Sequence, residues 1–181
     1  MRIIAGSLRG RRLKAPTWEG LRPTSDTLRE TLFNILASRP AGIAGVRFLD
    51  GYAGTGAIGI EAISRGAAHV TFVERDRRAQ ALIADNLGHC GIADGYAIIR
   101  ASADRAFADL ANAASVFDIV VLDPPYGQDA AAAVGSIVAP GGILVLERAK
   151  RSTPPDAIGP LARTRDVVAG DSALSFYAWP P

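Results

Sequence analysis

The sequence has little cysteine and histidine, and it has no long uninterrupted apolar run. Its single cysteine, Cys90, excludes an internal disulfide and a multi-cysteine metal site, and fits a reducing compartment. The two histidines, His69 and His89, lack partners at ligand spacing, so we expect no metal. Charged residues interrupt every apolar run well short of a membrane span, and the N-terminus lacks the apolar core of a secretory signal. These features predict a cytoplasmic protein with no membrane partner.

Positive charge is concentrated at one end of the chain. Residues 1–39 carry eight Arg or Lys against three acids, whereas the rest of the chain carries 12 basic and 15 acidic groups out of totals of 20 and 18. A basic arm beside a mildly acidic body indicates a polyanionic partner. On charge alone, a solvated Arg-rich surface explains the pattern equally well.

Strands and helices alternate from residue 46 onward. Short apolar runs rich in branched residues read VRFLD, HVTFVE, YAIIR, FDIVVLD and GILVLER, and segments of helical character lie between them at 57–65, 77–90, 103–114 and 129–138. This alternation predicts right-handed βαβ units and a parallel sheet covered on both faces. The runs LARTRDVV and SALSFYAW are separated only by AGD, which predicts an antiparallel hairpin. The expected class is α/β, with seven strands of which the last is antiparallel.

The first forty residues follow a different pattern. Residues 2–4 and 11–15 flank the turn-forming stretch AGSLRG, which predicts a small β-hairpin. A helix follows, with Thr24 or Ser25 as its cap and an end at Pro40. Its apolar face is expected to comprise Leu28, Leu32, Ile35 and Leu36.

A glycine-rich turn joins the first strand of the alternating region to its first helix. Gly54, Gly56 and Gly59 satisfy G-x-G-x-x-G, which lets a ligand approach a helix N-terminus, although close strand-to-helix packing explains any single glycine. Asp50 ends the preceding strand, so a cationic ligand is favoured over an anionic pyrophosphate. Glu74 ends the next strand, where it can accept hydrogen bonds from two ribose hydroxyls. It supports an adenosine ligand without choosing between NAD and S-adenosylmethionine.

The fourth strand ends in Asp123-Pro124-Pro125-Tyr126. Two prolines make a rigid turn whose carbonyl groups point outward, and the tyrosine adds a face on which a base can stack. These acceptors suit an exocyclic amine on a planar base and would orient its nitrogen for attack on a sulfonium methyl. An isolated D-P-P is most simply a strand-ending turn, but ligands of such sheets bind beyond the strand ends. The ends here carry Asp50, Glu74, Arg100, Asp123 and Glu147.

Taken together, the motifs resemble those of the RsmD family, bacterial methyltransferases acting on a guanine N2 amine of small-subunit (16S) ribosomal RNA. The resemblance lies in MRIIAGSLRGRRL, RPTSDTLRETLFNIL, FLDGYAGTGAIGIEAISRGA, VTFVERD, FDIVVLDPPYG, GGILVLE and GDSALSFY. It implies a class I, Rossmann-like methyltransferase fold with S-adenosylmethionine as cofactor. It also implies an N-terminal hairpin and helix extension over residues 1–39, which helps to hold RNA, and a catalytic domain over residues 40–181.

The resemblance assigns the site residue by residue. The target base would be held by Asp123, Pro124, Pro125 and Tyr126. The cofactor would be contacted by Asp50, Ala53, Gly54, Gly56, Glu74 and Ser102, where Ser102 replaces the family's usual acid. RNA phosphates would be contacted by Arg9, Arg11, Arg12, Lys14 and Arg22. Tyr52 takes the aromatic place in the glycine loop, and Trp18 is left open between stacking on RNA and hydrophobic cover.

Three other functions compete with this interpretation. An NAD-dependent dehydrogenase would share the glycine loop but has no use for D-P-P-Y. An adenine-N6 methyltransferase on DNA or RNA would use the same turn, although such enzymes more often have Asn at the position of Asp123. A non-catalytic RNA-binding or ribosome-assembly protein could retain the fold. The expected partner is small-subunit ribosomal RNA, either naked or in a partly assembled subunit, bound by a monomer.

Overall fold

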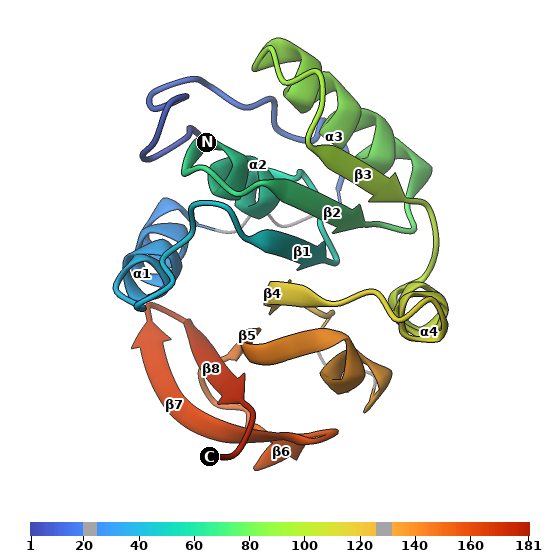
Figure 1. Ribbon diagram of the computed structural model, residues 1–181. Coiled ribbons are helices and arrows are strands. Elements are labelled where there is room, and N and C mark those ends of the chain that lie inside the picture. Colours follow the sequence, from blue (N-terminus) through green and yellow to red (C-terminus); the bar gives the residue numbers. More distant parts are fainter. Residues whose placement is uncertain (20–24, 126–131) are drawn as a thin grey trace.

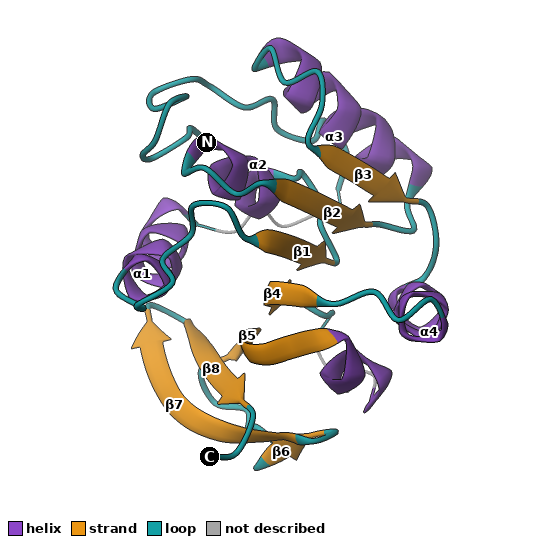
Figure 2. Ribbon diagram, viewed as in Figure 1, coloured by secondary structure: helices purple, strands orange, loops and turns teal. Residues whose placement is uncertain are grey.

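The computed structural model describes residues 1–19, 25–125 and 132–181, which form a single sheet with helices on both sides (Figures 1 and 2). The eight strands of the described chain lie in the order β3-β2-β1-β4-β5-β8-β7-β6. Their bounds are β1 Arg47–Gly51, β2 His69–Val73, β3 Tyr96–Ile99, β4 Phe117–Leu122, β5 Val138–Ala149, β6 Ala157–Ile158, β7 Leu161–Ala169 and β8 Ser172–Ala178. Neighbours from β3 to β5 are parallel, and the pairs that involve β6, β7 or β8 are antiparallel.

The predicted α/β class is confirmed, and the strand count differs by one. The extra strand is β6, whose two residues pair with the start of β7. So short a strand carries no hydrophobic period from which it could be predicted. The predicted hairpin of the last two strands is formed by β7 and β8, and β8 continues the ladder along β5.

Helices occupy the segments with helical periodicity. Their bounds are α1 Asp26–Ala37, α2 Ala57–Ser64, α3 Arg77–His89 and α4 Ala103–Asn112. The helix predicted at 129–138 is instead the 3₁₀ helix η1, Ala132–Ile137, and residues 129–131 lie outside the described chain. Close packing accompanies this tighter turn, because a Cβ on Gly135 would lie 2.7 Å from the Ile158 carbonyl oxygen.

Two hydrophobic clusters cover the two faces of the sheet. The first packs α1, α2 and α3 against one face, and includes Phe33 stacked on Phe48 with their ring centroids 6.2 Å apart. The second packs α4 and η1 against the other face, around Phe107 and Phe117. Ser25 caps α1 by accepting a hydrogen bond from the Leu28 N–H, whereas Thr24 lies outside the described residues. On the predicted apolar face of α1, only Ile35 is less than fully buried, beside Leu28, Leu32 and Leu36.

Strand register determines which residues meet at the carboxyl edge of the sheet. Gly51, at the end of β1, is paired with Val73 of β2 and with Leu122 of β4. The residues that follow, Glu74 and Asp123, therefore flank the glycine loop from two sides. Glu147 follows Leu146, the partner of Leu122, so it lies at the same edge as expected, but β5 does not end there: it continues to Ala149 because β8 extends its ladder.

The N-terminal segment turns back on itself as predicted, but the expected β-hairpin is reduced to one antiparallel bridge between Arg2 and Arg12. The backbone of Ile4 and Ala5 binds α2. The buried Glu61 carboxylate accepts hydrogen bonds from the Ile4 N–H at 2.8 Å and from the Ala5 N–H at 3.0 Å. Ile3 and Leu13 are buried in the same cluster as α1 and α2. The segment is thus packed onto the body of the protein.

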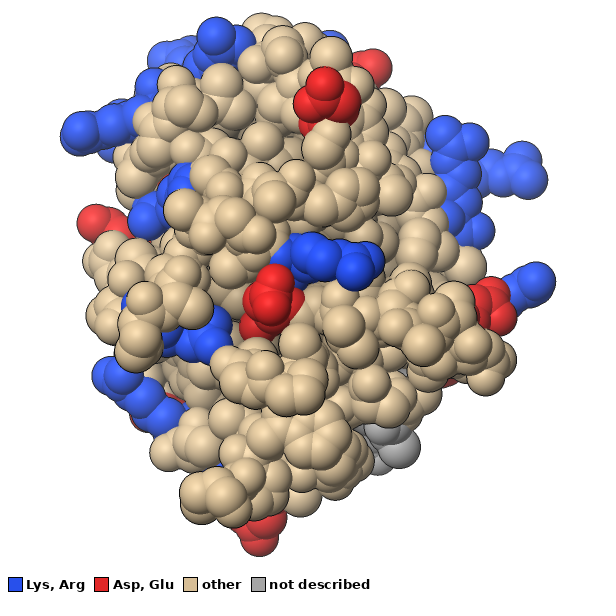
Figure 3. Space-filling view, in the orientation of Figure 1, with Lys and Arg blue, Asp and Glu red and all other residues tan. Residues whose placement is uncertain are grey.

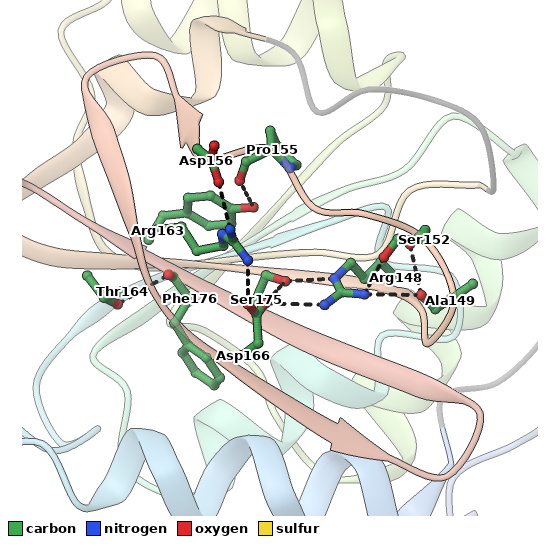
Figure 4. A network of polar contacts seen from close by, with 11 residues as sticks. Arg148, Ala149, Ser152, Pro155, Asp156, Arg163, Thr164, Asp166, Ser175 and Phe176 are labelled. Atoms are coloured by element: carbon green, nitrogen blue, oxygen red, sulfur yellow. Dashed lines mark hydrogen bonds and ion pairs between the residues drawn. The ribbon is translucent and has the colours of Figure 1, made fainter.

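A polar network braces the antiparallel half of the sheet (Figure 4). Arg148 on β5 donates hydrogen bonds to Ser175 on β8, to Asp166 on β7 and to the Ser152 carbonyl. Arg163 donates to Asp166 and to the carboxylate of Asp156, each at 2.6 Å. The network therefore attaches the connection after β5 to the sheet.

No helix among the described residues is long and apolar enough to cross a membrane.

We predict that Glu61→Ala destabilises the protein by about 3 kcal/mol, because two backbone N–H groups and the Arg65 guanidinium would lose their buried acceptor. Chemical denaturation measures this free energy of unfolding. Glu30→Ala, at an exposed site on α1, is the matched control and should change it by less than about 0.5 kcal/mol. Equal stability of the two variants would contradict the anchoring role of Glu61.

Candidate cofactor and base-binding site

The glycine loop turns sharply between β1 and α2. Gly54 and Gly56 have φ angles of 55° and 76°, in the left-handed region that favours glycine, and Tyr52 has a φ of 63°. Gly59 has another reason to be glycine, because a Cβ there would lie 2.2 Å from a ring carbon of Phe72. Of the three glycines in the motif, two therefore shape the turn and the third lets α2 pack closely on β2.

Glu74 holds the glycine loop from the side of β2. Its Oε2 accepts the Gly54 N–H and its Oε1 accepts the Asp76 N–H, both at 2.8 Å, while its side chain is almost fully buried. Gln80 donates a further hydrogen bond to the Glu74 carbonyl. Since a carboxylate oxygen has two lone pairs, each oxygen can accept one more hydrogen bond. The predicted binding of ribose hydroxyls is compatible with this geometry and stays a prediction.

Asp50 lies beneath the loop, 2% exposed, and its Oδ2 accepts the N–H of Gly59 at 2.8 Å. Burial raises the pKa of this carboxyl well above its ordinary value, and the negative charges of Asp123 and Glu74 raise it further against the effect of the Gly59 hydrogen bond. The site therefore concentrates negative charge. A cationic group bound beside it would relieve this repulsion, whereas an anion would increase it.

Asp123 lies directly beside the end of β1. Its backbone N–H donates to the Gly51 carbonyl at 3.4 Å, and its side chain is partly exposed. Pro124 is also partly exposed and Pro125 is exposed, so the turn passes from the sheet edge to the surface within three residues. Tyr126, the predicted stacking residue, lies outside the described residues.

The remaining predicted cofactor contacts lie around the same edge. Ala53 is 8% exposed and its N–H donates to the Val73 carbonyl at 2.9 Å. Ser102 is exposed at the N-cap of α4, and its side chain makes no capping hydrogen bond there. Tyr52 packs edge-on against Phe107 with 6.4 Å between ring centroids. Within the described chain, no group of three or more His, Cys, Asp or Glu is placed to hold a metal ion.

The structure divides the predicted RNA-binding residues into two kinds. Arg9, Arg11, Arg12 and Lys14 are all exposed, and Arg22 lies outside the described residues. Arg11 donates a hydrogen bond to the Cys90 carbonyl at 2.7 Å, and Lys14 pairs with Asp85 at 3.3 Å, so both are attached to α3. Arg9 and Arg12 form no ion pair with any described residue, which leaves their charges available to a ligand.

A second group of arginines lies at the carboxyl edge of the sheet; the sequence analysis placed Arg100 at a strand end without giving it a role, and it did not identify the other three. Arg75, Arg77 and Arg78 follow Glu74 directly, and Arg100 follows β3, so all belong to the carboxyl edge; all are exposed. The run R-D-R-R after a strand-ending acid was a signal that could have identified three of them. The fourth becomes their neighbour only through pairing of β2 with β3.

Comparison with known proteins gives matches over the whole chain. The family model described as "Conserved hypothetical protein 95" matches residues 1–178. YlbH of Bacillus subtilis, which is named provisionally as an rRNA methyltransferase, is 33% identical over 98% of both chains. Ribosomal RNA small subunit methyltransferase D of Escherichia coli is 42% identical over 70% of this chain, an alignment that spans 60% of that protein.

Solved structures agree with these matches. The yhhF protein of Escherichia coli, titled provisionally a methyltransferase, superposes with a TM-score of 0.82 at 30% identity, covering 100% of this chain and 99% of that one. A more distant structure from Pyrococcus horikoshii, titled provisionally an RNA methyltransferase, has a TM-score of 0.71 at 17% identity over 94% of both chains, which supports the fold alone. The sheet order, the glycine loop with its flanking acids, and these full-length matches together show that the chain belongs to the RsmD family.

Proposed function

We propose that this protein transfers a methyl group from S-adenosylmethionine to the exocyclic N2 amine of a guanine in small-subunit ribosomal RNA. The proposal rests on one observation: the predicted cofactor-binding residues and the predicted base-binding turn, which we call the two half-sites, lie at one edge of the sheet. The D-P-P turn joins the end of β1 through Asp123 and Gly51, and Glu74 holds the glycine loop on the other side. Relatives named as small-subunit rRNA methyltransferases support the choice of substrate.

The described residues fit this cofactor. Glu74 retains one lone pair on each carboxylate oxygen for the two ribose hydroxyls, and the hydroxyl of Ser102 is exposed beside the end of β3. Asp50 and Glu74 favour a sulfonium and an ammonium over a pyrophosphate, because a cation bound beside them would stabilise their charged forms. When bound, S-adenosylmethionine supplies an electrophilic methyl group on a positively charged sulfur.

In the proposed mechanism, Asp123 and the proline turn orient the target amine. The carboxylate of Asp123 and a carbonyl of the turn accept the two N–H groups, which favours a pyramidal nitrogen with its lone pair directed at the methyl carbon. Bound S-adenosylmethionine would supply the methyl group and would keep the electron pair of the broken C–S bond on its sulfur, so the residues of this chain have only to position the amine. The amine then releases one proton, to Asp123 or to water. Positioning and charge complementarity supply most of the acceleration, and Asp123 need not act as a base before transfer.

The N-terminal residues complete the proposal. Residues 1–39 form the RNA-binding extension of a catalytic domain made by residues 40–181, and Arg9 and Arg12 contact phosphates. Since the arm packs on α2 and α3, its charges are held at a set position relative to the catalytic edge. A monomer acting in the cytoplasm, where ribosomal RNA is assembled, is sufficient for this activity.

An assay of labelled methyl transfer followed by nucleoside analysis tests this function against its rivals. The substrate is small-subunit ribosomal RNA from cells that lack the gene, either naked or as subunits. We expect N2-methylguanosine as the product. N6-methyladenosine would favour the adenine-specific alternative, and RNA binding without methyl incorporation would favour a non-catalytic assembly protein.

We predict that Asp123→Ala lowers the rate of methyl transfer by about 10²-fold or more, because the variant lacks a positioned acceptor for the amine. Affinity for S-adenosylmethionine, measured by calorimetry, should change little. Asp109→Ala removes a carboxylate from the exposed face of α4 and is the matched control, with wild-type rates. Wild-type transfer by Asp123→Ala would remove this residue from the mechanism.

We also predict that Arg9→Gln combined with Arg12→Gln weakens RNA binding and makes it less dependent on salt. For single-stranded RNA, the slope of log affinity against log salt should fall by about 1.4, which is about 0.7 for each phosphate that the protein no longer neutralises. Arg11→Gln should have a smaller effect on the slope, because that guanidinium binds the Cys90 carbonyl. An unchanged slope in the double variant would make Arg9 and Arg12 ordinary solvated residues.

A further inference from the structure

Four exposed arginines form a basic surface at the carboxyl edge of β2 and β3. We call Arg75, Arg77, Arg78 and Arg100 the edge arginines. Arg77 and Arg78 begin α3, and the pairing of Val73 with Ile99 sets Arg100 beside the residues that follow β2. Figure 3 shows basic side chains gathered on the right of the molecule, over the ends of β2 and β3, apart from the group over the N-terminal segment.

Trp18 lies against this surface. The Arg78 guanidinium carbon is 5.1 Å from the centroid of its ring, a cation–π contact, and the indole is partly exposed. Two hydrogen bonds bring the chain to this place: the Lys14 N–H donates to the Asn86 side chain at 2.8 Å, and the Asn86 amide donates to the Lys14 carbonyl at 3.2 Å. The aromatic ring therefore reaches α3 from the N-terminal arm.

Arg78 is oriented from its other side by Asp76. Its Nη2 lies 2.9 Å from one carboxylate oxygen of Asp76 and its Nε lies 3.3 Å from the other. Asp76 in turn caps α3, and its N–H donates to Glu74 at 2.8 Å. Glu74 also binds the Gly54 N–H. The stacked pair of Trp18 and Arg78 is thus attached to the residues that shape the glycine loop.

The charges on this surface divide into paired and unpaired ones. Asp76 is matched by Arg78, and the neighbouring carboxylates are Glu19, next to Trp18 in sequence, and Asp104 near Tyr52. Within the described chain, Arg75, Arg77 and Arg100 form no ion pair. Three unpaired guanidinium groups beside a partly exposed indole match the chemistry of a single-stranded nucleic acid, with phosphates for the cations and a base for the ring.

We propose that a nucleotide flanking the target guanine stacks on Trp18 while its phosphates bind Arg75, Arg77 and Arg100. This inference rests on the proposed function. A base whose amine enters the site must leave its stack, which leaves its neighbours unstacked and able to use an aromatic surface. Arg78 holds the indole from one side without competing for phosphate, since Asp76 neutralises it. The RNA is thereby bound on both the arm and the edge arginines.

Fluorescence reports on this contact directly, because the chain has two tryptophans. Trp179→Phe leaves Trp18 as the single indole. Trp18→Phe leaves Trp179, which follows β8 and whose Nε1 donates a hydrogen bond to the Val138 carbonyl. Small-subunit ribosomal RNA from cells lacking the gene is the titrant. We expect it to quench emission from Trp18 and to leave emission from Trp179 unchanged. Equal responses of the two variants would overturn the proposed stacking.

Affinity measurements give an independent test. Trp18→Ala should weaken RNA binding by about tenfold or more, and Trp18→Phe should restore most of the affinity. Changing Arg75, Arg77 and Arg100 together to Gln should lower the salt slope by about 2. Arg165→Gln, an exposed arginine on β7, is the matched control and should leave RNA binding unchanged. Affinity for S-adenosylmethionine should be preserved in every variant.

The outcomes separate this inference from the proposed function. If the wild-type protein methylates RNA while Trp18→Ala and the triple arginine variant bind RNA as the wild type does, only the inference is wrong. If the wild-type protein neither binds nor methylates RNA, both are wrong. If Trp18→Ala proves unfolded by thermal melting, the fluorescence of folded Trp179→Phe and the arginine variant decide the matter.

Discussion

The hydrogen bonds of the Glu74 carboxylate to two backbone N–H groups hold the proposed site together. One bond attaches the glycine loop through Gly54, and the other attaches the start of α3 through Asp76. Parallel pairing of β1, β2 and β4 brings these segments to one edge, and the loop is attached further by the Ala53 N–H to the Val73 carbonyl and by the Asn86 amide to the Thr55 carbonyl. A single buried acid thus relates the proposed cofactor loop to the helix that bears the edge arginines.

A second buried acid, Glu61, attaches the N-terminal arm to the body of the protein. By accepting the Ile4 and Ala5 N–H groups it aligns the arm along α2, while Asn86 fixes the arm against α3. RNA bound by the arm would consequently meet the catalytic edge in one orientation. Such positioning is the main contribution that a methyltransferase without a strong general base can make.

The sequence predicted the parallel sheet, the helices and the placement of Glu74 and Asp123, because alternating periodicity and strand-ending acids are local signals. It did not predict β6, which is too short to have a period, or that β5 continues past Glu147, which depends on pairing with β8. It also could not separate Arg11 from Arg9. The partner of Arg11 is a backbone carbonyl at residue 90, and only the packing of the arm on α3 brings the two together.

The contact between Trp18 and Arg78 was beyond sequence reasoning for the same reason. Trp18 could be assigned only to RNA stacking or to hydrophobic cover, since its neighbour belongs to a distant helix.

The proposed function is methylation of a guanine N2 amine of small-subunit ribosomal RNA. Mass mapping of that RNA from cells with and without the gene is the most direct test of it. We expect one guanine to lose its N2-methyl group in the deletion strain and to regain it with the wild-type gene. Identical methylation in both strains, or a missing methyl group on an adenine, would contradict it.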